Sequence, residues 1–231
     1  MTNNLFDTMF KKNILLYGLI FIPIIFFCWY LFSNQTNKPN RYLAYFGPKN
    51  SNKINDSSYH KIPDFEFTNQ YNEAVNSNSI KNKIYLAEFF FTTCKSICPK
   101  MNTNLKKVYK TFKNNPNFLI LSHTVYPEID SVNVLLDYSN QYEVTDKKWL
   151  FLTGQKKDLY YLARKGYLLN NEIGNGDEND FIHTQNTALI DYEKHIRGFY
   201  DLTDSSEIIR LIQEINLLQA EYDYKKMNTT N

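Results

Sequence analysis

Two cysteines four residues apart are the residues of this sequence whose types and spacing indicate chemistry most directly. Cys94 and Cys98 lie in the run Phe89 to Pro99, after an apolar stretch typical of a buried strand and before a stretch with helical spacing. The positive end of a helix macrodipole favours the thiolate, the form of cysteine that attacks disulfides and binds metal ions. The pair therefore predicts a redox-active dithiol or part of a soft-metal site. Two inert core thiols or a static disulfide remain the alternative.

Histidine is the natural further ligand for such a pair. A structural zinc site usually takes four protein ligands, whereas two sulfurs and one imidazole form a trigonal set suited to copper as Cu(I) or Cu(II). His183 stands between a polar loop and a predicted strand, where a loop can carry it towards the thiols. His123 ends a predicted strand, where a packed histidine is the commoner case, and His60 and His195 are expected to be solvated. His183 is thus the candidate ligand, with a locally hydrogen-bonded loop histidine as the alternative.

Hydrophobic periodicity predicts the elements that must position these residues. The predicted strands are 83–91, 117–125, 149–152, 186–190 and 196–200, and the predicted helices are 99–112, 132–142, 156–165 and 204–222. Pro99 suits the first turn of its helix, and Asp204 or Ser205 can cap the last one. This order predicts an α/β fold, a thioredoxin-like sandwich with a central mixed β-sheet.

The amino-terminal part of the chain predicts a single transmembrane helix. Ile14 to Phe32 is an uncharged stretch of nineteen residues, nearly long enough to cross a hydrocarbon core of roughly 30 Å. Lys11 and Lys12 precede it, so the positive-inside rule places the amino terminus in the cytoplasm. A cleaved signal peptide is the alternative, but its apolar region would be about 7–15 residues and would end in a small-residue cleavage site. Cys28 is then a small apolar residue in the bilayer.

The chain is accordingly expected to have four parts. Residues 1–33 form a cytoplasmic amino terminus and anchor, 34–60 a tether, 61–225 the thioredoxin-like domain and 226–231 a tail, with an apolar island at 42–46 that can dock on the domain. The first thirteen residues contain no arginine, unlike a mitochondrial presequence, which favours a bacterial inner membrane with the carboxy-terminal domain in the periplasm. A formal charge of +2 gives no support for a nucleic-acid partner.

The cysteine run resembles the signature of a known family. Residues 87–101 contain Cys-x₃-Cys-Pro and are similar to the signature of the SCO/SenC proteins. Further similar segments are 62–65, 121–125, 149–154 and 181–184, so the resemblance covers roughly residues 61–217. It implies a membrane-anchored, thioredoxin-like protein with a role in copper delivery to cytochrome c oxidase. Carried over to this chain, the family's copper ligands are Cys94, Cys98 and His183.

The sequence also departs from the family pattern. Tyr126 stands where the family often has aspartate before proline, and Glu128 and Asp130 follow it. Lys95 occupies a position where proline is common, and the turn near residues 71–73 lacks the usual Asp-Gly. None of these differences removes a ligand, but Tyr126 leaves the role of the family's carboxylate open.

Two functions follow from the resemblance and the dithiol. One is a copper metallochaperone that assists assembly of the dinuclear copper centre in a cytochrome c oxidase subunit. The other is a thiol-disulfide oxidoreductase that keeps the cysteines of such a partner reduced, with Cys94 and Cys98 as the redox pair. In an oxidising compartment the dithiol itself needs a reductant, such as a thioredoxin-like protein. An acidic loop at 177–180 is expected to be an ordinary solvated loop, with cation steering as the alternative.

Overall fold

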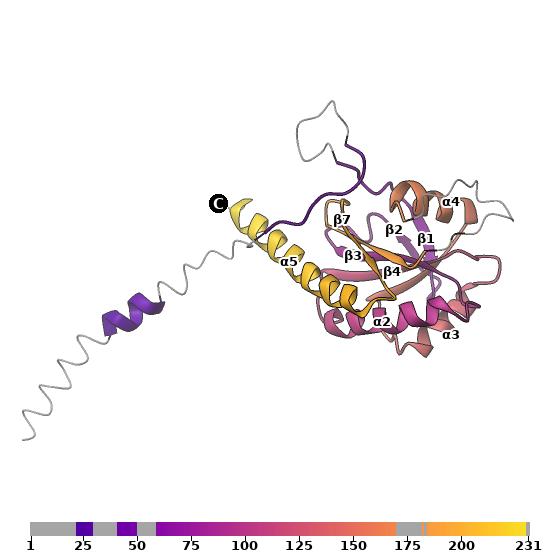
Figure 1. Ribbon diagram of the computed structural model, residues 1–231, viewed down its shortest axis with the longest axis horizontal. Helices are drawn as coiled ribbons and strands as arrows, with labels where there is room; N and C mark the ends of the chain where they lie inside the picture. The colour runs from indigo at the N-terminus through magenta and orange to yellow at the C-terminus, as the bar shows by residue number, and fades with distance from the viewer. Residues whose placement is uncertain (1–21, 30–40, 50–58, 170–181, 183, 230–231) are drawn as a thin grey trace, which may run out of the picture. The chain divides into compact units, whose positions relative to one another are not determined.

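The computed structural model describes residues 22–29, 41–49, 59–169, 182 and 184–229 (Figure 1). The chain divides into two compact units, Met1–Lys38 and Pro39–Asn231. In the first unit residues 22–29 are helical with exposed side chains, and the rest of the predicted span 14–32 lies outside the described residues. Among the described residues, no helix combines the length and the apolar character that crossing a membrane requires.

The second unit is built on one seven-stranded sheet with the order β2-β1-β5-β4-β3-β6-β7. Its strands are β1 (Glu66–Asn69), β2 (Ala74–Asn76), β3 (Ile84–Phe90), β4 (Phe118–Thr124), β5 (Trp149–Thr153), β6 (Asn186–Ile190) and β7 (Ile196–Asp201). Strands β3, β4 and β5 pair in parallel, and the other neighbouring pairs are antiparallel. The central mixed sheet that the sequence predicts is therefore confirmed.

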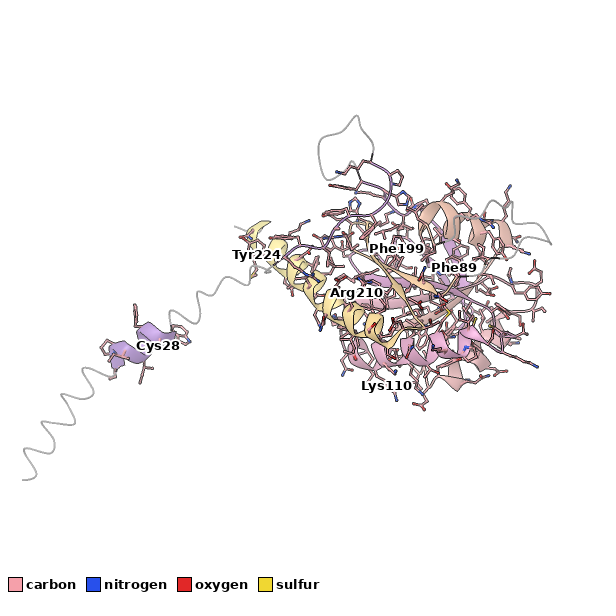
Figure 2. The ribbon with its side chains drawn as sticks, in the orientation of Figure 1. Cys28, Phe89, Lys110, Phe199, Arg210 and Tyr224 are labelled. Atoms are coloured by element: carbon pink, nitrogen blue, oxygen red, sulfur yellow. The ribbon has the colours of Figure 1, made fainter. Side chains whose placement is uncertain are left out.

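Helices cover both faces of this sheet (Figure 1). They are α2 (Ile97–Phe112), α3 (Val132–Gln141), α4 (Lys156–Tyr161), the π-helical turn η2 (Leu162–Gly166) and α5 (Ser205–Thr229). Apolar residues of α2, α3 and α5 share one core cluster with one face of the sheet, and those of α4 and η2 share a second cluster with the other face. Arg210 of α5 points to strand β7, where its guanidinium donates to the carbonyl of Phe199 at 2.8 Å (Figure 2).

Strand β3 lies near the middle of the sheet and is buried on both faces. All seven of its residues are buried, which explains why the sequence shows a near-continuous apolar run and no alternation. Leu86 and Phe90 join the cluster under α2, and Tyr85 and Phe89 join the opposite cluster. The strand therefore has no exposed face, and its carboxyl end delivers the chain to the surface where the cysteine run begins.

Most predicted elements are confirmed, and the differences have physical reasons. Strands β1 and β2 escaped prediction because they are only four and three residues long, with few buried side chains to set a pattern. The predicted helix 156–165 ends early in a π-helical turn, since the N–H of Tyr167 donates to the carbonyl of Leu162 at 2.7 Å. Helix α5 reaches Thr229, beyond the predicted end at residue 222.

The apolar island at residues 42–46 packs on the domain. The N–H of Leu43 donates to Glu221 Oε1 at 2.6 Å, and the N–H of Phe46 donates to the carbonyl of Ile196 at 2.9 Å. The first contact joins the segment to α5, and the second joins it to β7. Part of the expected tether is therefore an ordered addition to the edge of the sheet.

A buried arginine holds this segment in place. Arg197 on β7 donates to Glu221 Oε2 at 2.7 Å and to Asp191 Oδ2 at 3.1 Å. The same guanidinium donates to the carbonyls of Leu43 and Ala44 at 2.7 and 3.2 Å. A buried charge is tolerated when it is paired and hydrogen-bonded. Arg197 pairs with two carboxylates, and each of its three guanidinium nitrogens donates at least one hydrogen bond.

We expect Glu221→Gln to destabilise the domain by about 3 kcal/mol, because it leaves Arg197 buried with less counter-charge. The matched control is Glu207→Gln, which removes a partly exposed partner of Arg210 on the same helix and should cost about 1 kcal/mol or less. Chemical denaturation of both variants measures the difference in the free energy of unfolding. Equal losses in the two variants would contradict the role assigned to Arg197.

Candidate functional site

Cys94 and Cys98 lie where strand β3 passes into helix α2. The N–H of Cys94 donates to the carbonyl of Phe91 at 3.2 Å, and the helix begins at Ile97. Ser96, the residue before the helix, makes no side-chain bond to the first turn. Instead the N–H of Cys98 donates to Cys94 Sγ at 3.5 Å. The sulfur of Cys94 thus accepts one of the N–H groups that a helix start leaves without a partner.

The two thiols are free and have different environments. Burial raises the pKa of Cys94, but hydrogen bonds from the backbone N–H groups of Cys98 and Ser96 outweigh it and lower the pKa to about 7. For Cys98 burial dominates and raises the pKa well above its ordinary value, and the negative charge of Glu88 adds to this effect. Near neutral pH a large fraction of Cys94 is therefore thiolate, while Cys98 stays protonated.

A buried carboxyl group, Glu88, lies on the same face of β3 as the dithiol. It is 0% exposed, and neither carboxyl oxygen has a hydrogen-bond partner among the described residues. Strand side chains alternate between faces, so Glu88 points with Leu86 and Phe90 towards the cluster that contains Cys98. Burial raises the pKa of Glu88 to about 8, against a smaller opposing effect of Ser122. The carboxyl group is accordingly mostly neutral at pH 7.

A second buried carboxylate, Asp130, holds the turn that precedes Cys94. It is 0% exposed, accepts the N–H of Thr92 at 3.3 Å, and accepts the hydroxyls of Thr92 and Thr124. Thr124 is the last residue of β4, so these bonds tie the turn to the neighbouring strand. The carboxylate that supports the dithiol loop in this chain therefore comes from Asp130, whereas Tyr126 occupies the position where the SCO/SenC family often has aspartate.

A pocket of about 390 Å³ opens beside Cys98. Its lining is mostly apolar with a polar edge, and consists of Phe89, Phe90, Phe91, Ile97, Cys98, Val125, Leu169, Ile182, Thr184, Gln185 and Asn186. Ile182 and Thr184 come from the segment before β6. They lie close to the dithiol because β6 runs antiparallel to β3, with Ala188 opposite Ala87.

The predicted ligand His183 lies outside the described residues, between Ile182 and Thr184. The acidic loop 177–180 also lies outside them. Among the residues that the structure does describe, no group of three or more His, Cys, Asp or Glu side chains is arranged to hold a metal ion. Cys28 is an exposed free cysteine in the helical segment 22–29. The described part of the site therefore consists of Cys94 and Cys98 with their supports.

The expectation that His60 and His195 are solvated is wrong. His195 is 1% exposed, and its Nδ1 lies 3.0 Å from the carbonyl of His60. His60 is half-buried, with Nε2 at 2.7 Å from the carbonyl of Gly166. Tyr45 of the docked segment lies edge-on to the His195 ring with centroids 5.2 Å apart, and the His60 ring lies against Gly166. A sequence without tertiary contacts cannot indicate these neighbours.

His123 is a packed histidine, as its place on a strand indicated. It is 0% exposed and stacks on Phe89 with ring centroids 5.0 Å apart. Phe67 contacts the imidazole edge-on with centroids 5.7 Å apart, and Tyr167 contacts it in a tilted arrangement at 5.4 Å. Its side chain is on the face of β4 away from the dithiol. Burial lowers the pKa of His123 to about 4, so the ring is neutral at physiological pH.

Two residues that support the site were missed from sequence. Glu88 is a single acidic residue inside an apolar run, and Asp130 follows β4 after the short connecting segment 125–129. A charged residue in a predicted buried strand is a usable signal, because burying an unpaired charge is costly. Asp130 gives no comparable signal, since acidic residues are common in loops between a strand and a helix.

Comparison with known proteins agrees with this geometry. The family model for SCO1/SenC matches residues 54–217. A SCO1 protein homolog of Bacillus subtilis is 27% identical over 165 residues, covering 71% of this chain and 85% of the relative. This chain belongs to the SCO1/SenC family.

Solved structures of Sco proteins share the fold. BsSco, described as a Sco-family cytochrome c oxidase assembly protein with a disulfide switch, is 25% identical with a TM-score of 0.59, covering 70% of this chain and 93% of that one. Yeast Sco1 with copper bound is 19% identical with a TM-score of 0.52, covering 68% and 92%. The thioredoxin-like α/β fold with a mixed central sheet is therefore shared with SCO1/SenC proteins.

The opposite pKa shifts of Cys94 and Cys98 predict that alkylation is selective for Cys94. Iodoacetamide should modify Cys94 with a pH midpoint of about 7, because only the thiolate reacts and its fraction rises as pH passes the pKa. Cys98 should resist modification in the native protein over the same range. Mass spectrometry of tryptic peptides separates the two rates, with Cys98→Ser and Cys94→Ser as controls that each keep one thiol of the pair. A midpoint for Cys94 near the ordinary value of 9.0 contradicts the assignment.

The buried imidazole predicts a pH dependence of stability. In the unfolded chain His123 binds a proton near pH 6.5, but in the folded protein only near pH 4, so acid favours the unfolded state between these values. The wild type should lose about 3 kcal/mol more than His123→Phe between pH 7 and pH 4. Urea unfolding at several pH values measures this, and parallel pH curves for the two proteins would refute it.

Proposed function

We propose that this SCO1/SenC protein is a copper metallochaperone that assists assembly of the dinuclear copper centre of cytochrome c oxidase. The observation that carries the proposal is the pair of free thiols at the start of α2, one of which has a pKa of about 7. Two soft sulfur ligands suit copper, and a thiolate already present near neutral pH reduces the competition between proton and metal. The copper ion is the cargo of this reaction.

We propose His183 as the third ligand. Its neighbours Ile182 and Thr184 line the pocket that also contains Cys98. An imidazole added to two thiolates gives a three-ligand set that can hold both Cu(I) and Cu(II). The register between β3 and β6 supports this choice, because it brings the segment before β6 to the end of β3 where the cysteine run starts.

We also propose the chain's organisation. Residues 14–32 anchor it in a bacterial inner membrane, residues 34–60 lead to the domain, and the domain at 61–225 works in the periplasm, with 226–231 as a tail. The uncharged character of the anchor segment and the two lysines before it support this orientation. The expected partners are a copper-accepting subunit of cytochrome c oxidase and a thiol reductant such as a thioredoxin-like protein.

A thiol-disulfide oxidoreductase is the second candidate, favoured by the unlike thiols. The Cys94 thiolate would attack a partner disulfide, forming a mixed disulfide and releasing one partner thiolate. Cys98, once deprotonated, would attack Cys94 Sγ, releasing the second partner thiolate and leaving a Cys94–Cys98 disulfide. Two electrons pass to the partner. These two steps require a reactive thiol, here Cys94, next to a protonated and buried thiol, here Cys98.

Copper titration distinguishes the two candidates. We expect the reduced full-length protein to bind one copper ion, and His183→Ala to weaken Cu(II) binding by roughly tenfold or more but Cu(I) binding by less than about threefold, because two thiolates can hold Cu(I) alone. Competition with chelators of known affinity measures both constants. The histidine control is His195→Gln, which alters a buried ring far along the sheet from the dithiol.

Variants of the same protein test the oxidoreductase function. Cys94→Ser and Cys98→Ser should each abolish tight Cu(I) binding if copper is the cargo. If the wild-type protein reduces a disulfide substrate and His183→Ala leaves the affinities for both copper ions unchanged, the metallochaperone proposal fails. The oxidoreductase function then remains.

A further inference from the structure

A hollow of about 490 Å³ lies at the end of the sheet remote from the dithiol. Lys83 directly precedes β3 and lines this hollow, whereas the cysteine run follows the other end of the same strand. Lys148 directly precedes β5 and also lines it. Because β3, β4 and β5 are parallel, the amino ends of all three strands meet here. The hollow is thus separate from the proposed copper site.

The wall of the hollow carries an excess of positive charge. Four lysines line it together with two acidic residues, and these are Lys83, Lys113, Lys147, Lys148, Glu73 and Asp146. Lys147 is paired with Glu73 at 2.6 Å. Asp146 accepts hydrogen bonds from the Tyr109 hydroxyl at 3.0 Å and from the backbone N–H of Lys148 at 2.8 Å. In the described part of the chain, no carboxylate lies within 4.0 Å of the ammonium groups of Lys83, Lys113 or Lys148.

Two of these lysines are held close together by adjacent carbonyls. Lys148 Nζ donates to the carbonyl of Asn115 at 2.8 Å, and Lys83 Nζ donates to the carbonyl of Pro116 at 2.7 Å. Each ammonium has three N–H donors, so each lysine keeps N–H groups that the carbonyl bond does not use. Burial lowers the pKa of Lys148, and the positive charge of Lys83 lowers it further against an opposing effect of the Asp146 carboxylate, which reflects the closeness of two like charges. An anion between them would relieve that repulsion.

The floor of the hollow is apolar. Val75, Ile80, Leu119 and Leu150 line it and are only 4, 5, 8 and 6% exposed. An apolar floor with a few convergent charged groups is the usual pattern of a small-molecule site. A purely structural role for the lysines, bonding the carbonyls that follow α2, accounts for Lys83 and Lys148. It accounts neither for Lys113, which makes no such bond among the described residues, nor for the open apolar floor.

We propose that this hollow binds a small amphipathic anion, a molecule with an apolar body and a phosphate or carboxylate group. The apolar body packs on Val75, Ile80, Leu119 and Leu150. The anionic group accepts hydrogen bonds from Lys113 and Lys148, with Lys83 adding its charge. The same chemistry occurs in free small molecules and in lipid headgroups, and the presence of an apolar floor and lysines within one hollow of about 490 Å³ favours a free molecule.

Phenyl phosphate is the probe for the first test, with the full-length protein in neutral detergent micelles. We expect calorimetric binding with a Kd of about 0.1–1 mM. Inorganic phosphate lacks the apolar body and benzyl alcohol lacks the charge, so both should bind at least about tenfold more weakly. Raising the salt concentration should weaken phenyl phosphate binding, since the contact is partly electrostatic.

Variants locate the binding to the hollow. Lys113→Gln removes a cation without breaking a described contact and should weaken phenyl phosphate about fivefold, and Lys113→Gln with Lys148→Gln should weaken it more. Lys157→Gln, an exposed lysine on α4 outside the hollow, is the matched control and should change nothing. Acetylation footprinting read by mass spectrometry should show protection of Lys113 and Lys148 by phenyl phosphate and none at Lys157.

Unchanged affinity in Lys113→Gln, or protection spread evenly over all lysines, would overturn the proposal. A second arm places the protein in phosphatidylglycerol or phosphatidylcholine nanodiscs without phenyl phosphate. Protection of Lys113 and Lys148 by phosphatidylglycerol alone, with no binding of phenyl phosphate in micelles, would replace the free ligand by a lipid headgroup and overturn the proposal as stated. Copper affinity should be the same in Lys113→Gln and the wild type.

Discussion

The rest of the structure depends on the pairing of strand β3 on both of its edges. Parallel pairing with β4 places Phe90 beside Thr124, and antiparallel pairing with β6 places Ala87 beside Ala188. The first pairing brings Asp130 within reach of the turn before Cys94. The second brings the segment before β6 to the same edge. Because both registers are set by burial on two faces of the sheet, a slip of one residue would turn the whole apolar set of β3 towards the wrong layer.

The difference between the two thiols follows from where the strand ends and the helix begins. Cys94 lies in the turn, where its sulfur can accept the N–H of Cys98, and Cys98 lies in the first turn of the helix, where its side chain is packed. Identical side chains thus acquire opposite pKa shifts, because backbone N–H groups stabilise the Cys94 thiolate and burial disfavours a thiolate at Cys98. Glu88 adds to the difference where it is ionised, because its negative charge opposes a second negative charge on Cys98.

Polar groups in this fold are buried for distinct physical reasons. Arg197 is fully paired and connects β7, α5 and the segment at residues 41–46, so its desolvation is offset by charge pairing and by bonds to two carbonyls. Glu88 and His123 lie on opposite faces of the sheet and stay neutral near pH 7. Of these groups only Arg197 has its polar atoms fully bonded within the described residues, and it alone stabilises by fixing one segment to another.

The sequence by itself determined the order of the elements, the buried character of β3, the place of the dithiol at a helix start and membership of the family. These are local properties, since hydrophobic period, helix-start chemistry and motif spacing are all read within about a dozen residues. Only the tertiary structure decided that Cys94 and Cys98 differ, that Glu88 and Asp130 support them, and that His60 and His195 are enclosed. Burial and hydrogen bonding between residues distant in sequence set these features. A lysine pair such as Lys83 and Lys148, sixty-five positions apart, becomes one charged hollow only when parallel strands bring their amino ends together.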